Sequence, residues 1–111
     1  SQVFTGMKNV VSGGAGTARR LQGIGGGNYF VFAKTGTINE QGSGAKNSRR
    51  LIVMLADKDL TQAENIGTAK TYSFYFTIEN ARDFDWSLLQ NIIKSAMGST
   101  SFTNYFKNEN G

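Results

Sequence analysis

Two continuous apolar runs and one alternating segment, each five to seven residues long, constrain the fold of this chain more than any other feature of its sequence. Residues 29–33 and 51–56 are continuously apolar and are bounded by polar and glycine-containing stretches, a pattern typical of strands covered on both faces. We therefore expect both strands to be central in a sheet. Residues 72–78 alternate between apolar and more polar side chains, which predicts a third strand with one face less deeply buried than the other.

Polar segments connect these runs. Residues 39–48 predict a hairpin-like loop between the first two strands, and residues 57–70 form a second connection with a helical turn around residues 62–66. Ahead of the strands, residues 13–28 contain seven glycines, which predicts a loop that includes a short helical turn near Arg19. Strands joined by such loops are expected to pair antiparallel.

Amphipathic segments flank the strands on both sides. A first helix ending at Gly13 and Gly14 is predicted by apolar side chains at three- and four-residue spacing, at Val3, Phe4, Met7, Val10 and Val11. A second helix over residues 86–97 is predicted by Asp85 as its cap, by Gly98 as its stop, and by an apolar stripe at Trp86, Leu88, Leu89, Ile92, Ile93, Ala96 and Met97. Residues 99–111 are assigned no element and are treated as a tail.

These elements predict an α+β fold, an antiparallel sheet with flanking helices. The strands should span residues 29–37, 50–57 and 71–79, with the helix over residues 86–97 packed on one face. The first helix should pack nearby through Phe4, Met7 and Val11.

The amino-acid composition excludes several classes of functional site. The chain has 111 residues, which fits one domain, and it contains no cysteine and no histidine. Disulfides, thiolate catalysis and histidine-based sites are therefore excluded. We expect no cofactor and no metal, because the acidic pairs at residues 57 and 59 and at residues 83 and 85 fit a strand-end turn and a helix cap better than a cation site.

The net charge of +4 includes two arginine pairs, at residues 19–20 and 49–50. Such a balance favours anionic partners, although charge runs most often form a solvated surface. No segment approaches the roughly 20 consecutive apolar residues of a membrane-spanning helix.

The sequence motif that best indicates a function is Lys34, Thr35, Gly36 and Thr37, at the end of the first predicted strand. Lys-Thr-Gly is a signature of β-lactamases and penicillin-binding proteins. Upstream, residues 7–11 are Met-Lys-Asn-Val-Val and residues 16–18 are Gly-Thr-Ala. In this order, with two strands and a helix to follow, residues 7–97 resemble the C-terminal part of a penicillin-binding transpeptidase domain, in the superfamily of serine D,D-transpeptidases and β-lactamases.

The resemblance implies how the four residues act. A substrate peptide lying along the strand gains main-chain hydrogen bonds, and Gly36 permits close approach of the ligand backbone. The hydroxyls of Thr35 and Thr37 donate to a terminal carboxylate, and Lys34 adds positive charge and assists proton movement. The family resemblance also makes the Thr37 N–H one of two oxyanion-hole donors, so Lys34 and Thr37 are the candidate catalytic residues and residues 34–37 the substrate-binding strand.

The family's nucleophile is not expected in this chain. It comes from a Ser-x-x-Lys at a helix start, supported by a Ser-x-Asn loop, and both precede the Lys-Thr-Gly strand. The sequence has no Ser-x-Asn. Ser43-Gly44-Ala45-Lys46 matches Ser-x-x-Lys only in spelling, since it follows Lys34 in a glycine-containing loop. We expect the nucleophile on a preceding segment, and this chain alone to be inactive.

The resemblance further implies partners and a location. The partners are the peptidoglycan stem peptide, β-lactam antibiotics and the remainder of the transpeptidase domain, and an exposed strand edge could also cause self-association. The location is the extracytoplasmic cell envelope, on the periplasmic side of the inner membrane, with anchoring through parts outside this sequence.

Two other functions fit the sequence less well. One is a non-catalytic or binding module of the same fold. The other is a sheet that stacks single-stranded nucleic acid on Tyr29, Phe32, Tyr75 and Phe76 beside the arginine pairs. We expect those aromatic side chains to face the core instead, and therefore no nucleic-acid partner.

Overall fold

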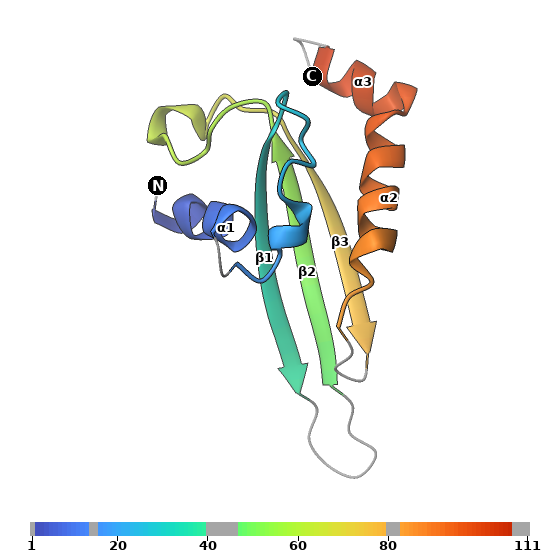
Figure 1. Cartoon of the computed structure of the whole chain (residues 1–111). Helices are drawn as coiled ribbons and strands as arrows, with labels where there is room; N and C mark the ends of the chain where they lie inside the picture. Colours follow the sequence, from blue (N-terminus) through green and yellow to red (C-terminus); the bar gives the residue numbers. More distant parts are fainter. Residues whose placement is uncertain (1, 14–15, 40–46, 80–82, 108–111) are drawn as a thin grey trace.

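The computed structural model describes residues 2–13, 16–39, 47–79 and 83–107 of the chain. Its sheet has three antiparallel strands in the order β1, β2, β3 (Figure 1). Their bounds are Phe30–Asn39 for β1, Asn47–Ala56 for β2 and Thr71–Glu79 for β3. The α+β class is confirmed, as are the presence and the antiparallel pairing of all three predicted strands, although β1 ends two residues later and β2 begins three residues earlier than predicted.

The helical elements surround this sheet. They are α1 (Gln2–Ser12), α2 (Trp86–Met97), α3 (Thr100–Lys107), and two single turns of 3₁₀ helix, η1 (Arg19–Leu21) and η2 (Ala63–Asn65). Both short turns lie where the sequence predicts them. No described helix combines the length and apolar composition that crossing a membrane requires.

The position of β1 in the sheet corrects one expectation. Its apolar run predicted a central strand, but among the described residues β2 alone lies between two neighbours, and β1 is at the edge. The run is explained by burial on both faces: Phe32 and Ala33, adjacent residues that point to opposite faces, are both fully buried. A continuous apolar run therefore indicates that both faces of a strand are covered. It does not indicate that the strand is hydrogen-bonded to a neighbour along both of its edges.

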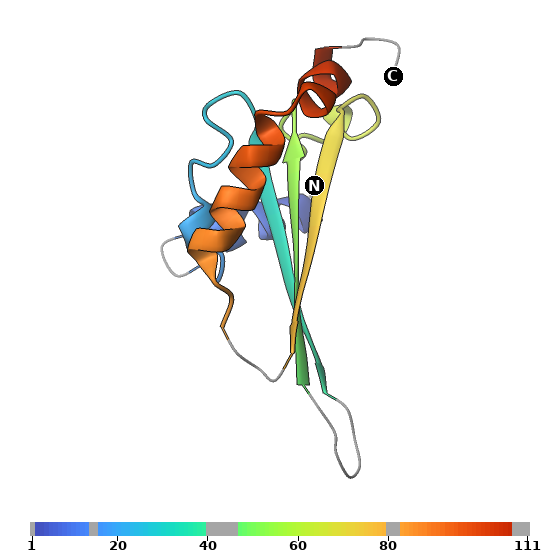
Figure 2. The same cartoon turned by 90° about the vertical axis from the view of Figure 1, so that its right-hand side faces the viewer.

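The face that packs on α2 holds the larger core. Alternation along β2 places Leu51, Val53 and Leu55 on this face, where all three are fully buried together with Ile93 of α2. Figure 2 shows α2 running along this side of the sheet. Asp85 caps the helix as predicted, because the Leu88 N–H donates to its carboxylate at 3.1 Å.

The opposite face holds a smaller core. Phe32, Ala56 and Leu60 are buried there, with Phe4 and Met7 of α1 packed against them. The rings of Phe4 and Phe32 meet edge to face, with 5.7 Å between their centroids. At the other end of α1, Val11 joins the larger core. The predicted packing of the first helix is confirmed, and α1 contributes to both cores from beside β1.

Two helical stripes are narrower than the periodicity predicts. Val3 of α1 is 70% exposed, and Leu88 and Ile92 of α2 are 52% and 42% exposed. Each of these side chains lies at the rim of its stripe, where the helix surface turns away from the sheet.

Helix α3 is an element that the sequence reading missed. The Ser99 hydroxyl accepts the Phe102 N–H at 3.2 Å, and the fully buried Phe102 packs on Tyr29 and Tyr72. The apolar residues of α3, Phe102, Tyr105 and Phe106, have helical spacing, but the polar residues between them weaken the periodic signal of the helix.

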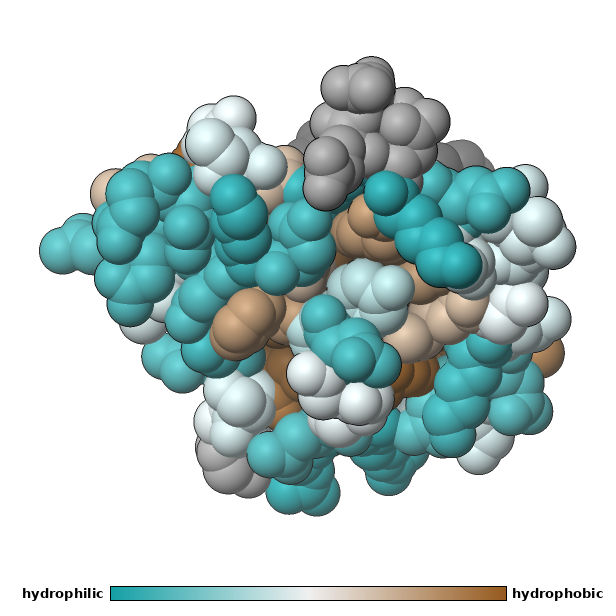
Figure 3. Space-filling view, turned by 90° about the horizontal axis from the view of Figure 1, so that it is seen from above, coloured by the Kyte–Doolittle hydropathy of each residue, from teal (hydrophilic) through white to brown (hydrophobic). Residues whose placement is uncertain are grey.

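The surface of the molecule is mostly polar when it is seen from the end that is uppermost in Figure 1. Apolar residues are visible between the polar ones near the centre of this view (Figure 3).

Candidate functional site

The four residues of the Lys-Thr-Gly-Thr sequence lie within β1, and not at its end as predicted. The strand continues to Asn39, and Lys34 pairs with Ile52 while Thr37 pairs with Arg49. The antiparallel ladder to β2 therefore fixes the backbone of all four residues. Because one edge of β1 is held in this way, its other edge can bind an extended peptide as an additional strand.

The other edge of β1 carries no strand among the described residues. Helix α1 lies beside the first half of β1, and the C-terminal half, which contains Gly36 and Thr37, extends beyond that helix (Figure 1). Gly36 and Thr37 are exposed, as is the Lys34 side chain. Neither arrangement that would have argued against peptide binding, a β1 strand paired on both edges or a Gly36 buried under a helix, is present in the described part of the chain.

No contact within the described part of the chain explains a glycine at position 36. A Cβ built on it would meet no described atom within 4 Å, and its φ is not in the left-handed region. Gly16 differs, because a Cβ there would lie 2.3 Å from the carbonyl oxygen of Val10. Glycine inside a strand weakens it unless a ligand or another backbone approaches closely. At Gly36 the described chain supplies no such neighbour, so the open space is available to a ligand.

Lys34 lies beside a groove between α1 and β1. The groove has a volume of about 520 Å³ and is lined by Lys34 together with Gln2, Val3, Gly6, Met7 and Val10 of the helix. The sequence reading placed Val3 and Met7 on a buried helix face and did not assign them to a site. Only the packing of α1 beside β1 brings them to Lys34.

Thr35 and Thr37 point to the opposite face from Lys34 and Gly36, as strand alternation requires. Thr35 is half-buried and Thr37 is exposed. The side chains of Lys34, Thr35 and Thr37 therefore do not converge on one face, and what the four residues share is the outer edge of β1. A ligand that follows this edge would have Lys34 on one side and the two hydroxyl groups on the other.

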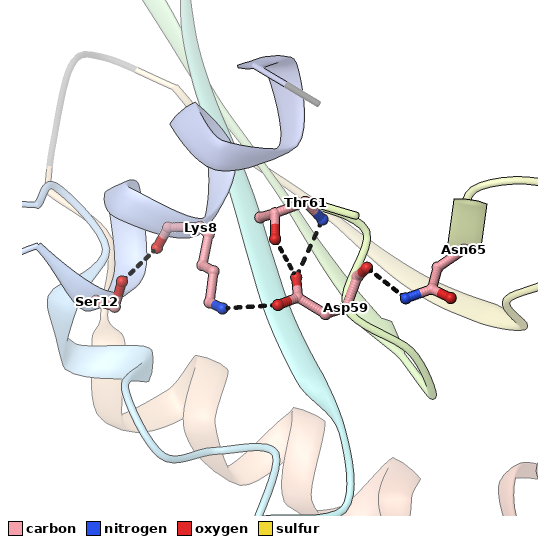
Figure 4. Close-up of polar contacts among 5 residues, drawn as sticks. All are labelled: Lys8, Ser12, Asp59, Thr61 and Asn65. Carbon is pink, nitrogen blue, oxygen red and sulfur yellow. Dashed lines mark hydrogen bonds and ion pairs between the residues drawn. The ribbon is translucent and has the colours of Figure 1, made fainter. Parts of the chain in front are cut away.

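A group of polar contacts holds α1 in place beside β1 (Figure 4). Lys8 of α1 donates to one carboxylate oxygen of Asp59 at 3.3 Å, and the hydroxyl and the N–H of Thr61 donate to the other at 2.7 and 3.0 Å. The Thr61 hydroxyl lowers the pKa of Asp59 most, opposed by partial burial and assisted by the Thr61 N–H and by Lys8. Asp59 thus links the β2–β3 connection to the helix that forms one wall of the groove.

One member of each acidic pair has the structural role expected of it. Asp57 accepts the Lys70 N–H at 2.9 Å at the end of the strand pair, and Asp85 caps α2. Within residues 2–13, 16–39, 47–79 and 83–107, no three acidic side chains gather as a metal site would require. The Ser43 to Lys46 match lies outside the described residues.

The aromatic side chains proposed for nucleic-acid stacking do not form one platform. Tyr29 packs against Phe102 and Phe106, Phe32 is fully buried on the α1 side, and Phe76 is half-buried on the α2 side. Among these four aromatic residues Tyr75 alone is well exposed, at 75%.

Comparisons with models of protein families, with curated proteins and with solved structures find no match to this chain.

Proposed function

We propose that this chain supplies the substrate-binding strand of a serine D,D-transpeptidase, and that β1 binds acyl-D-alanyl-D-alanine peptides and β-lactams along its outer edge. The observation that carries this proposal is the open space over Gly36 on an edge strand whose neighbouring residues are Lys34, Thr35 and Thr37. The order of the sequence elements and the Lys-Thr-Gly-Thr sequence itself support the same function.

The proposed ligand binding and catalysis both depend on the outer edge of β1. A peptide added as a further antiparallel strand receives main-chain hydrogen bonds from β1, and its terminal carboxylate is an acceptor for threonine hydroxyls. The Lys34 ammonium favours that anion and can assist proton transfer once a serine nucleophile is present. A Thr37 N–H directed at the scissile carbonyl would stabilise the oxyanion by roughly 3 kcal/mol. In this proposal the serine comes from a Ser-x-x-Lys helix on a preceding segment, and the site operates in the cell envelope.

A substitution at Gly36 tests the strand. Gly36→Ala should leave the fold intact, because the added Cβ meets open space, but it should weaken binding of an acyl-D-alanyl-D-alanine peptide or a penicillin by at least about tenfold through steric exclusion of the ligand backbone. Binding is measured from the amide NMR shifts of residues 34–37 during titration.

Gly67→Ala is the matched control. Gly67 also has no described atom within 4 Å of an added Cβ, and it lies in the β2–β3 connection, which leaves the sheet opposite Phe30 and not opposite Gly36. Equal affinity of the Gly36→Ala and Gly67→Ala variants would contradict the proposal. So would shifts in β3 without shifts in β1.

Lys34 is tested in the same titration. Lys34→Met should lower the affinity for both the peptide and the penicillin, because both ligands are anionic. Lys94 is an exposed lysine on α2, and the control variant Lys94→Met should leave both affinities unchanged. The 111-residue chain should also keep its mass after incubation with penicillin. Covalent acylation of the chain would place the nucleophile within it and overturn the assignment to a preceding segment.

A further inference from the structure

A second hollow, on the α2 side of the sheet, is lined largely by arginine. It has a volume of about 500 Å³ and lies between η1, the start of β2 and the start of α2. Its described lining residues are Thr17, Arg19, Arg20, Arg49, Asp83 and Trp86. It is distinct from the groove at Lys34, because alternation along β1 and β2 puts Arg49 on the face opposite to Lys34.

The two arginines of η1 are held at this hollow by buried neighbours. Ala18 and Leu21, on either side of the pair, are fully buried, and the Ala18 N–H donates to the Val10 carbonyl of α1 at 2.9 Å. On the other side, the Gln90 amide of α2 donates to the Arg20 carbonyl. The backbone that carries Arg19 and Arg20 is thus fixed to both α1 and α2. A guanidinium on a fixed backbone loses less conformational freedom when it binds a ligand.

Arg49 reaches the hollow from the opposite wall. Its guanidinium lies 3.7 Å from the Asp83 carboxylate and 5.8 Å from the centre of the Phe84 ring. The Arg49 side chain is 31% exposed, whereas the Asp83 side chain is 67% exposed. The ring and the carboxylate orient Arg49, and the exposed carboxylate is itself an anion that an incoming ligand can displace.

Among the described lining residues, positive charges outnumber negative ones. Three guanidinium groups and one carboxylate give the described lining a net charge of +2. Arginine presents planar donor pairs that match the oxygens of phosphate and carboxylate groups, and a Thr17 hydroxyl and the Trp86 indole complete the lining.

We propose that this hollow is a binding site for a phosphate group that carries at least two negative charges. The site is separate from the peptide-binding edge of β1 and does not depend on the function proposed for it. Asp83 acts as an internal competitor, paired with Arg49 until the phosphate takes its place.

Trp86 provides a direct readout, because it is the single tryptophan of the chain and lines the hollow. Titration of the chain with pyrophosphate should change its fluorescence saturably, and acetate at the same ionic strength should not. Tighter binding of pyrophosphate than of orthophosphate would identify a diphosphate as the ligand group, and equal binding would identify a single phosphate. A fluorescence change that does not saturate, or that acetate reproduces, would overturn the proposal.

Arg49 and Arg50 form a matched pair for this test. They are adjacent and carry the same charge, but Arg50 pairs with Gly36 on the other face of the sheet. Arg49→Gln should weaken pyrophosphate binding by about tenfold, as expected for loss of one charged hydrogen-bonding partner, and Arg50→Gln by less than about twofold. Equal weakening by both would show attraction to net charge only, and would contradict a built site.

Two further variants keep the test valid if Arg49→Gln impairs folding. Arg20→Gln removes a charge on an exposed side chain whose anchoring contact is made by its backbone carbonyl, so the fold should be retained and the affinity reduced. Asp83→Asn removes the competing carboxylate and should tighten pyrophosphate binding several-fold. Unchanged affinity in both variants would overturn the proposal.

Discussion

The two faces of the sheet differ in how completely this chain covers them. On the α2 face, Leu51, Val53 and Leu55 are fully buried under one helix and its neighbouring aromatics. On the α1 face, Phe32 is fully buried, whereas the next rows expose Lys34, Gly36 and Tyr75 and leave Ile52 half-buried. The first face supplies most of the stability, whereas the second leaves a strand edge and part of a face open to other molecules.

Removal of Ile93 is the largest expected test of this difference. Ile93→Ala should lower the free energy of unfolding by about 3 kcal/mol, because it leaves a cavity in the α2-side core. The adjacent Ile92→Ala should cost below about 1 kcal/mol, since that side chain is 42% exposed. Denaturant unfolding of both variants checks the comparison. Similar losses from the two substitutions would mean that α2 presents a different face to the sheet.

The cap of α2 is the next test of how firmly the covered face is held. Asp85→Ala should destabilise the chain by about 1 kcal/mol, because the Leu88 N–H loses its acceptor at the helix start. Asp85→Asn keeps an acceptor oxygen and should cost only a few tenths of a kcal/mol. Thermal unfolding followed by circular dichroism measures both effects. A larger loss from the asparagine variant than from the alanine variant would argue against capping.

The Asp59 contacts test how α1 is held beside the open face. Because the folded pKa of Asp59 lies below its ordinary value of 3.8, its contribution to stability is present above that pH and is lost as the pH falls through the lower folded pKa. Asp59→Asn should therefore be less stable than the native chain at about pH 6, with the difference shrinking toward about pH 3. Denaturant unfolding at several pH values measures this. Glu64→Gln, an exposed carboxylate in η2, is the control.

The smallest effect is expected on the open face itself. Tyr75→Ala should change the free energy of unfolding by no more than about 0.5 kcal/mol, since the ring is 75% exposed. Phe74→Ala, one residue away, should cost about 2 kcal/mol because its ring packs into the α2-side core between Tyr72 and Phe76. Unfolding measurements on this pair compare the two faces along a single strand. Equal costs would show that both faces are covered in solution.

Elements with a strong local signal were predicted well from the sequence. The alternation in β3, the apolar runs of β1 and β2, and the stripe and cap of α2 are each set by neighbouring residues. Helix α3 was missed because three aromatic residues among serine, threonine and asparagine give a weak periodic signal. It is held by Tyr29 and Tyr72, which are far away in the sequence, and such long-range packing overrides local propensity.

The features of the candidate site also fall into two groups, those predicted from the sequence and those decided by the tertiary structure. By itself the sequence determined the identity of Lys34, Thr35, Gly36 and Thr37 and their place in a strand, because strand formation and side-chain alternation are local properties. Tertiary structure alone decided that this strand lies at the edge of the described sheet, that α1 forms a groove beside Lys34, and that Arg19 and Arg49 line one hollow. The physical reason is that edges, grooves and charge clusters are made by segments that are distant in the chain and meet only when the cores on the two faces of the sheet are packed.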